Sequence, residues 1–86
     1  MYEIIFTKKA AKQVQTLEKA HMQKLKEILL SLRENPFSYP YKKIRGEENI
    51  YRIRVGKFRI LYEVNDKDHL VIIFKIERRE RAYKRK

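Results

Sequence analysis

Residues 51–62 read YRIRVGKFRILY and carry the clearest structural pattern in the chain. On each side of Gly56-Lys57, apolar and charged residues alternate, which is the period-two pattern of a strand with one buried face. A Gly-X pair between two such runs suits a two-residue type II′ turn. The stretch therefore predicts a β-hairpin in which Val55 pairs with Phe58.

This register fixes the positions of three arginines on the polar face of the hairpin. It brings Arg54 opposite Arg59 and leaves Arg52 on the same face. Like charges directly opposite each other destabilise a sheet by up to roughly 1 kcal/mol per pair. One reading is that the side chains spread into water with their stems on the sheet. The other reading is a preorganised phosphate site, because a guanidinium grips phosphate oxygens bidentately and keeps its charge.

The first half of the chain predicts a strand followed by helical segments. Residues 2–6 are rich in β-branched and aromatic side chains, and Thr7 is a suitable N-cap for the helix that follows. Apolar residues then recur at helical spacing over 11–17 and 22–32. The two stripes are slightly out of phase, which predicts an antiparallel helix pair with a break near residues 18–21. One long kinked helix is the alternative.

The second half predicts three strands. Pro36 ends the helical pattern, and residues 35–49 form a turn-rich connection. Strands are expected over 50–55, 58–64 and from Leu70 onward. The fold class is therefore α+β, with the order strand, helix, helix and three strands. The helix pair packs on one face of a four-stranded, mostly antiparallel sheet, whose other face is open.

The register of the last strand depends on the loop 65–69. If Val64 pairs with Leu70, Lys75 lies opposite Arg59, although a loop one residue different would reverse the faces of this strand. With that pairing, the expected core face comprises Tyr51, Ile53, Val55, Phe58, Ile60, Tyr62, Val64, Ile72, Phe74 and Ile76. The expected open face comprises Arg52, Arg54, Arg59, Leu61, Lys75, Glu77 and Arg79.

Composition and charge limit the classes of function. Eighty-six residues suggest a single domain. The excess of 22 Lys and Arg over 11 Asp and Glu gives a net charge of +11, which favours a polyanionic partner, most commonly nucleic acid. The absence of cysteine is compatible with a reducing cytoplasm, and the short apolar run at the N-terminus is not a membrane span.

The available chemistry does not involve a metal or other cofactor. The acidic residues are scattered, whereas a metal-dependent nuclease needs grouped carboxylates. RNA can supply its own nucleophile, because its 2′-OH attacks the adjacent phosphate when it is held in line. The basic tail 79–86 adds further cations and one aromatic residue, Tyr83, which is able to stack on a base or to take part in proton transfer.

Two motifs resemble the RelE/ParE toxin superfamily of toxin–antitoxin systems. The stretch IRGEENIYRIRVGKFRILYEV at 44–64 is similar to the family signature, and RRERAY at 78–83 resembles its closing Arg-x-x-x-Tyr. The predicted order of elements also matches over essentially the whole chain. The chain looks most like the RelE branch, whose members cleave mRNA in the ribosomal A site by 2′-OH attack and without a metal.

The resemblance implies roles for five residues. Arg59 and Arg79 correspond to family arginines that stabilise the transition-state phosphate, and Tyr83 to the tyrosine that orients or deprotonates the 2′-OH. Arg52 and Arg54 correspond to positions that neutralise charge and assist the leaving group. Some members have lysine there, and arginine, with a pKa above about 12, does not readily donate a proton, so we expect these two to act by charge.

The resemblance also implies partners and leaves alternatives open. We expect a RelB-like antitoxin in a hetero-oligomer, together with the ribosome and mRNA, in the cytoplasm and without a membrane. The antitoxin would cover the apolar residues Leu61 and Ile73, which are expected on the open face. The alternatives are a ParE-like toxin that inhibits DNA gyrase and a catalytically inert RNA-binding relative. Further contacts to RNA are expected from six basic residues: Lys43, Arg45, Lys57, Lys75, Arg78 and Arg81.

Overall fold

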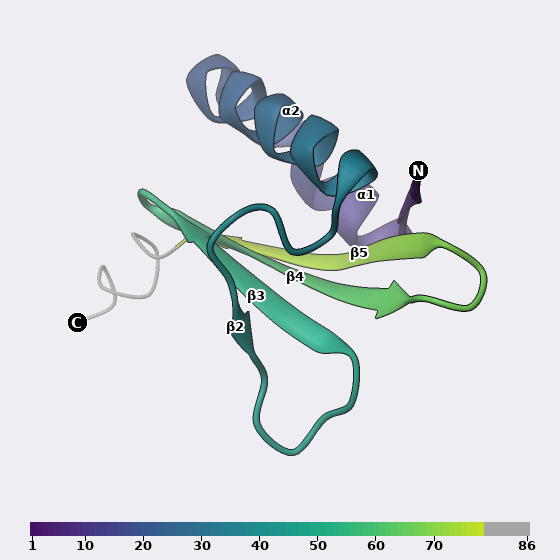
Figure 1. Cartoon of the computed structure of the whole chain (residues 1–86). Helices are drawn as coiled ribbons and strands as arrows, with labels where there is room; N and C mark the ends of the chain where they lie inside the picture. Colours follow the sequence, from purple (N-terminus) through teal and green to yellow (C-terminus); the bar gives the residue numbers. More distant parts are fainter. Residues whose placement is uncertain (79–86) are drawn as a thin grey trace.

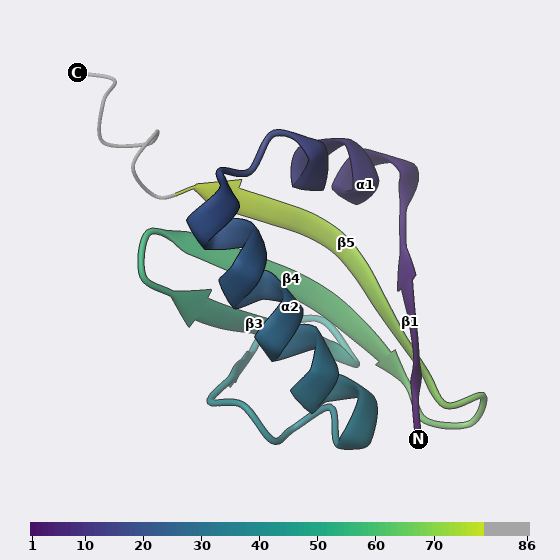
Figure 2. The same ribbon diagram turned by 90° about the horizontal axis from the view of Figure 1, so that it is seen from above.

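The computed structural model describes residues 1–78 and, for Arg78, the backbone alone; the predicted basic tail 79–86 lies outside the described residues. Two helices cover one face of a five-stranded sheet, and no helix of residues 1–78 lies on the other face (Figures 1 and 2). The predicted α+β class is confirmed, with one strand more than expected. The elements are β1 (Glu3–Phe6), α1 (Lys8–Gln15), α2 (Lys19–Glu34), β2 (Lys42–Lys43), β3 (Ile50–Val55), β4 (Phe58–Asn65) and β5 (Leu70–Arg78).

The start of α1 and the end of α2 lie where the sequence predicts. The side chain of Thr7 caps α1 by accepting a hydrogen bond from the amide of Ala10 at 3.2 Å. A break at residues 16–18 separates α1 from α2, slightly before the predicted position, so one continuous helix is not formed. Asn35, the residue before Pro36, ends α2 in an extended conformation. Within residues 1–78, neither helix is both long and apolar enough to span a lipid bilayer.

The sheet has the strand order β1-β5-β4-β3-β2. β1 is parallel to β5, and the other neighbouring pairs are antiparallel. The hairpin between β3 and β4 has the predicted register, with Val55 opposite Phe58 and Arg54 opposite Arg59. Gly56 has φ of +54°, which is the left-handed conformation that a type II′ turn requires at its first position.

β5 differs from the prediction in its register. Val64 pairs with Val71 rather than Leu70, so the first half of the strand is shifted by one residue. Phe74 is then skipped in the pairing with β4, which is a β-bulge. The placement of Ile72 and Phe74 in the core is therefore wrong: Val71 and Ile73 are buried in their stead. Because the bulge restores the alternation, Ile76 is buried as predicted.

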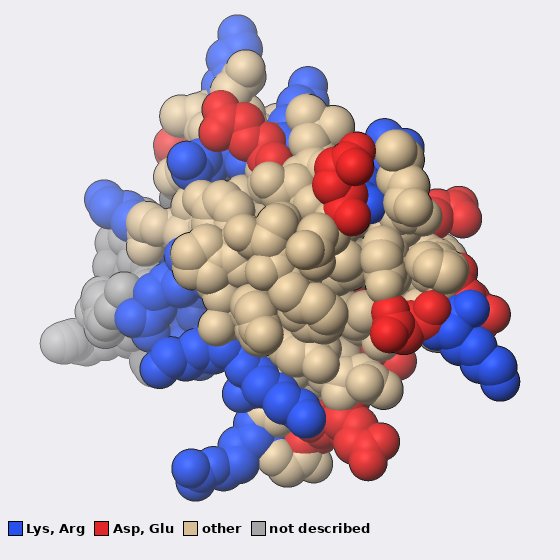
Figure 3. Space-filling model, in the orientation of Figure 1, with Lys and Arg blue, Asp and Glu red and all other residues tan. Residues whose placement is uncertain are grey.

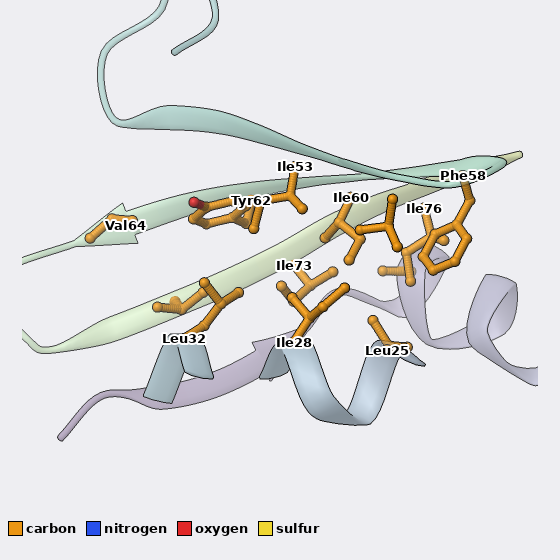
Figure 4. Close-up of a cluster of buried hydrophobic side chains, with 13 residues drawn as sticks. Leu25, Ile28, Leu32, Ile53, Phe58, Ile60, Tyr62, Val64, Ile73 and Ile76 are labelled. Carbon is orange, nitrogen blue, oxygen red and sulfur yellow. The ribbon is translucent and has the colours of Figure 1, made fainter. Parts of the chain in front are cut away.

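The core lies between the helices and the sheet (Figure 4). α2 contributes Leu25, Ile28 and Leu32 at helical spacing, and α1 contributes Ala10. These side chains pack on alternate residues of the strands, among them Ile53, Phe58, Ile60, Tyr62, Val64, Ile73 and Ile76. No charged side chain of the described residues is buried in this core. The strands are thus held firmly from one side, and their opposite-facing side chains are available for other contacts.

Candidate functional site

Three of the predicted arginines, Arg52, Arg54 and Arg59, lie on the sheet face away from the helices. Arg52 and Arg54 belong to β3 and alternate there with the buried Ile53 and Val55. Arg59 lies opposite Arg54 on β4. Core packing of the intervening residues therefore fixes the backbone that carries all three arginines. We call this group, with the flanking residues Lys42, Lys75 and Glu77, the arginine face.

β5 adds a carboxylate to the arginine face. Glu77, rather than the predicted Lys75, lies opposite Arg59, because the register of β5 differs from the expected one. One Glu77 carboxylate oxygen is 3.1 Å from Nη2 of Arg59, and the other is 3.1 Å from Nζ of Lys75. These side chains retain 27–38% of their exposure. The pairs therefore add little to stability but fix the relative positions of the charged groups.

The Arg59 side chain is held more firmly than an ordinary surface arginine. Its Nε is buried and has no hydrogen-bond partner among the described residues. An unpaired buried donor costs free energy, so this conformation depends on the packing of the stem and on the ion pair with Glu77. The guanidinium is thus preorganised on the open face of β4.

Arg52 and Arg54 are the unneutralised part of the arginine face. Neither forms an ion pair with any residue in the range 1–78. Lys42 of β2 lies directly opposite Arg52 and adds a third positive charge, which sequence reasoning missed because β2 has only two residues. Figure 3 shows one group of Lys and Arg side chains at the lower left beside a broad uncharged area, with others along the top and at the right. The face is therefore electrostatically prepared for an anion.

Three other predicted RNA contacts lie away from this face. Lys43 pairs with Tyr51, whose side chain is directed toward the core. Arg45 lies in the loop before β3, where Glu47 and Glu48 line the same pocket. Lys57, in the hairpin turn, lines a different pocket, near the start of α2. Of the six predicted contacts, Lys75 alone is shown to join the arginine face.

Several predicted residues cannot be placed. Arg79, Arg81 and Tyr83 lie outside the described residues, and the side chain of Arg78 is not described. The backbone of Arg78 ends β5 opposite Phe58, beside the hairpin that carries Arg54 and Arg59. The described part of the predicted catalytic set is therefore Arg52, Arg54 and Arg59.

An aromatic cluster lies next to the arginine face and was not predicted. It consists of Phe37, Tyr41, Tyr51 and Tyr62, whose neighbouring ring centroids are 5.1–5.8 Å apart. Phe37 and Tyr41 belong to the stretch FSYPYKK, whose aromatic content was the available signal. The cluster joins the connection 35–41 to the core of the sheet.

Tyr62 anchors the cluster and does not have the properties of a general base. Its hydroxyl donates a hydrogen bond of 3.0 Å to the carbonyl of Pro36. Burial raises the pKa of Tyr62 far above its ordinary value, and the neighbouring Tyr41 and Tyr51 raise it further. The neutral form is therefore stabilised, which suits a structural role.

The described residues contain no group of three His, Cys, Asp or Glu side chains placed to hold a metal ion. The arginine face itself offers positive charges and hydrogen-bond donors. Arginine pairs on a rigid sheet are suited to neutralising a phosphate and to stabilising the extra charge of its transition state.

Comparison with known proteins identifies close relatives. The family model described as the ParE toxin of type II toxin–antitoxin systems matches residues 4–83. A protein that carries the name of a RelE toxin in Methanocaldococcus jannaschii is 36% identical, with 96% of each chain covered.

Solved structures show the same fold. The chain superimposes on an archaeal RelE–RelB complex from Pyrococcus horikoshii with a TM-score of 0.82 and 32% identity, covering 93% of this chain and 97% of that one. The isolated Escherichia coli RelE toxin also gives a TM-score of 0.82, with 25% identity and coverage of 99% and 98%.

Proposed function

This chain belongs to the RelE/ParE toxin superfamily, and from that membership and its arginine face we propose that it is a ribosome-dependent mRNA endonuclease. The observation that carries the proposal is that Arg54 lies opposite Arg59 on the open face of the sheet. Neither Arg52 nor Arg54 forms an ion pair with any of the described residues. Cross-strand arginines are unfavourable for stability alone and favourable for binding a phosphate.

The proposed reaction is an attack by the 2′-OH of a ribose on its neighbouring phosphorus. A bond forms between the 2′-oxygen and phosphorus while the bond to the 5′-oxygen breaks, which leaves a 2′,3′-cyclic phosphate. The departing 5′-oxygen takes up a proton from water and becomes a 5′-hydroxyl. Glu77 holds the Arg59 guanidinium in position, and Arg59 stabilises the negative charge that develops on the phosphate. Arg52 and Arg54 neutralise the strand and the leaving oxygen. By family resemblance, Arg79 shares the role of Arg59 and Tyr83 accepts or orients the 2′-OH proton.

Primer extension on programmed ribosomes tests this proposal. We expect breaks in the mRNA with the wild-type chain. Arg59→Ala, Arg79→Ala and Tyr83→Phe should each lower the cleavage rate by about 10²- to 10³-fold while ribosome binding changes far less. Lys26→Gln is the matched control, because Lys26 is an exposed cation on α2, in the helix layer.

The ParE-like alternative is supported by the family model that matches the chain. It predicts inhibition of DNA supercoiling by gyrase and intact mRNA on the ribosome. Inhibited supercoiling without mRNA breaks would reject the endonuclease proposal. If both Arg79→Ala and Tyr83→Phe retained full cleavage, the endonuclease would stand and the assignment of these residues would be wrong.

We also propose a RelB-like antitoxin as partner, because matching structures include RelE–RelB complexes from two archaea. An acidic or amphipathic segment would complement the net charge of +11. Of the two apolar residues expected on the open face, Leu61 is partly exposed, but Ile73 is buried and cannot contact a partner. Co-expression of this chain with a RelB-like antitoxin, followed by size-exclusion chromatography, tests whether the two chains form a hetero-oligomer.

A further inference from the structure

The aromatic cluster presents two exposed rings on a rigid support. Phe37 and Tyr41 retain 39% and 44% of their exposure, whereas Tyr62 is fully buried and Tyr51 lies between. Each outer ring packs against Tyr51 at 5.1–5.5 Å, and Tyr51 packs on Tyr62. The exposed rings are therefore held in place by the core, so a flat ligand could stack on them with little loss of side-chain entropy.

The cluster borders the arginine face at the free edge of β3. Only Lys42 and Lys43 of β2 pair with β3. Pro40 and Tyr41 immediately precede this paired segment in the sequence. They line a pocket of about 270 Å³. The remaining lining residues are Lys42, Arg52 and Arg54. The pocket thus combines Tyr41 and Pro40 with three cations, and none of the acidic residues in the described part of the chain lines it.

This combination matches the chemistry of a nucleotide. A nucleobase presents a flat π-face for stacking, and the attached phosphate needs positive charge a short distance away. A purely apolar partner would leave the three cations without counter-charges, which is unfavourable. In Figure 3 the uncharged area and the concentration of Lys and Arg lie side by side on one surface of the molecule.

We propose that the pocket at Tyr41 binds one nucleotide of single-stranded RNA, with its base stacked on Tyr41 and its phosphate on Arg52 and Arg54. The inference rests on the proposed function in that RNA is the ligand. It adds a base-stacking position at Tyr41, beside the arginines that the proposed reaction uses. Since stacking tolerates every base, the site contributes affinity and alignment of the strand more than sequence choice.

Binding of a short, fluorescein-labelled single-stranded RNA tests this site by fluorescence anisotropy. Every ribose of the probe carries a 2′-O-methyl group, so that cleavage cannot take place. Tyr41→Ala should weaken binding by roughly 5- to 100-fold, the range for loss of one stacking platform. Tyr41→Phe keeps the ring and should bind like the wild type. Leu30→Ala is the control, because Leu30 is an exposed apolar residue on α2.

A second measurement keeps the test independent of folding. In the wild-type chain, a photoreactive 4-thiouridine probe should crosslink to Tyr41 or Phe37. The proposal is overturned if the wild type does not bind the probe, if Tyr41→Ala binds as tightly as wild type, or if crosslinks fall on the helix layer. Loss of antitoxin binding in Tyr41→Ala with unchanged RNA binding would likewise overturn it and assign the surface to the antitoxin.

The outcomes separate this site from the cleavage reaction. A chain that binds the uncleavable probe through Tyr41 but leaves mRNA intact on the ribosome would defeat the proposed endonuclease and retain the nucleotide site. If the wild type cleaves mRNA on the ribosome but Tyr41→Ala binds the probe as tightly as the wild type, the endonuclease is retained and the nucleotide site is rejected.

Discussion

Replacing Arg54 by glutamine should make the protein more stable. Arg54 lies opposite Arg59 and has no ion pair with the described residues, so its charge meets repulsion without compensation. Two unit charges about 7 Å apart in water repel by about 0.6 kcal/mol, and screening at 0.1 M salt roughly halves this. We expect the free energy of unfolding to rise by about 0.3–0.6 kcal/mol at low salt, which corresponds to an increase in Tm of roughly 1–4 °C.

Arg59→Gln provides the decisive comparison. It removes the same repulsion but also breaks the 3.1 Å contact with Glu77, which is worth about 0–1 kcal/mol at this exposure. It also removes the buried stem of Arg59, so its net effect should be neutral or destabilising. Arg54→Gln should therefore be the more stable of the two variants. Lys26→Gln makes the same change in net charge on an exposed part of α2 and controls for the overall charge of the chain.

Thermal and urea unfolding at low salt and at about 1 M salt would measure these differences. The advantage of Arg54→Gln should disappear at high salt, where the Debye length is only about 3 Å. Two results would refute the reasoning: greater stability of Arg59→Gln than of Arg54→Gln, or a gain that is unchanged by salt. Under the proposed function, the more stable Arg54→Gln variant should also cleave mRNA more slowly.

Three further changes test the fold that supports the arginine face. Tyr62→Phe loses the hydrogen bond to Pro36 and should lower the free energy of unfolding by about 1–2 kcal/mol at neutral pH. Because folding raises the pKa of Tyr62, the wild type should lose stability as the pH rises above about 10, where the tyrosine of the unfolded chain ionises first. Urea unfolding at alkaline pH should show that the free energy of unfolding depends less on pH in Tyr62→Phe than in the wild type. Gly56→Ala should lower the free energy of unfolding by about 1–2 kcal/mol, because φ is +54°, even though no atom obstructs the added methyl group. An unchanged Tm would show that alanine is not strained at this position. Thr7→Ala removes the N-cap of α1, where the Thr7 side chain accepts from the amide of Ala10, and should lower the free energy of unfolding by about 0.5–2 kcal/mol. Urea unfolding followed by circular dichroism would measure this loss.

The sequence predicted those features that depend on neighbouring residues. Gly56-Lys57 determined the hairpin, and with it the opposition of Arg54 and Arg59, because a two-residue turn allows a single register. The register of β5 could not be obtained in this way. Its run LVIIFKI is apolar at nearly every position, so either face could be the buried one and the bulge at Phe74 leaves no signal.

Features that depend on distant partners were also beyond the sequence. β2 is a two-residue strand of lysines, which has no strand pattern, and it forms because β3 lies beside it. The aromatic cluster unites residues 37 and 41 of a connection with rings on β3 and β4. Composition indicated an anionic ligand, but only the fold brought Tyr41 to Arg52 and Arg54.

The position of β5 in the sheet affects how the protein is synthesised. β5 follows the other described strands in the sequence, yet it lies between β1 and β4, so β1 has no partner in the sheet until β5 has been synthesised. Such pairing of distant segments forms slowly and late. We therefore expect β1 to remain unpaired in a nascent chain until β5 has left the ribosomal exit tunnel and has added to β4.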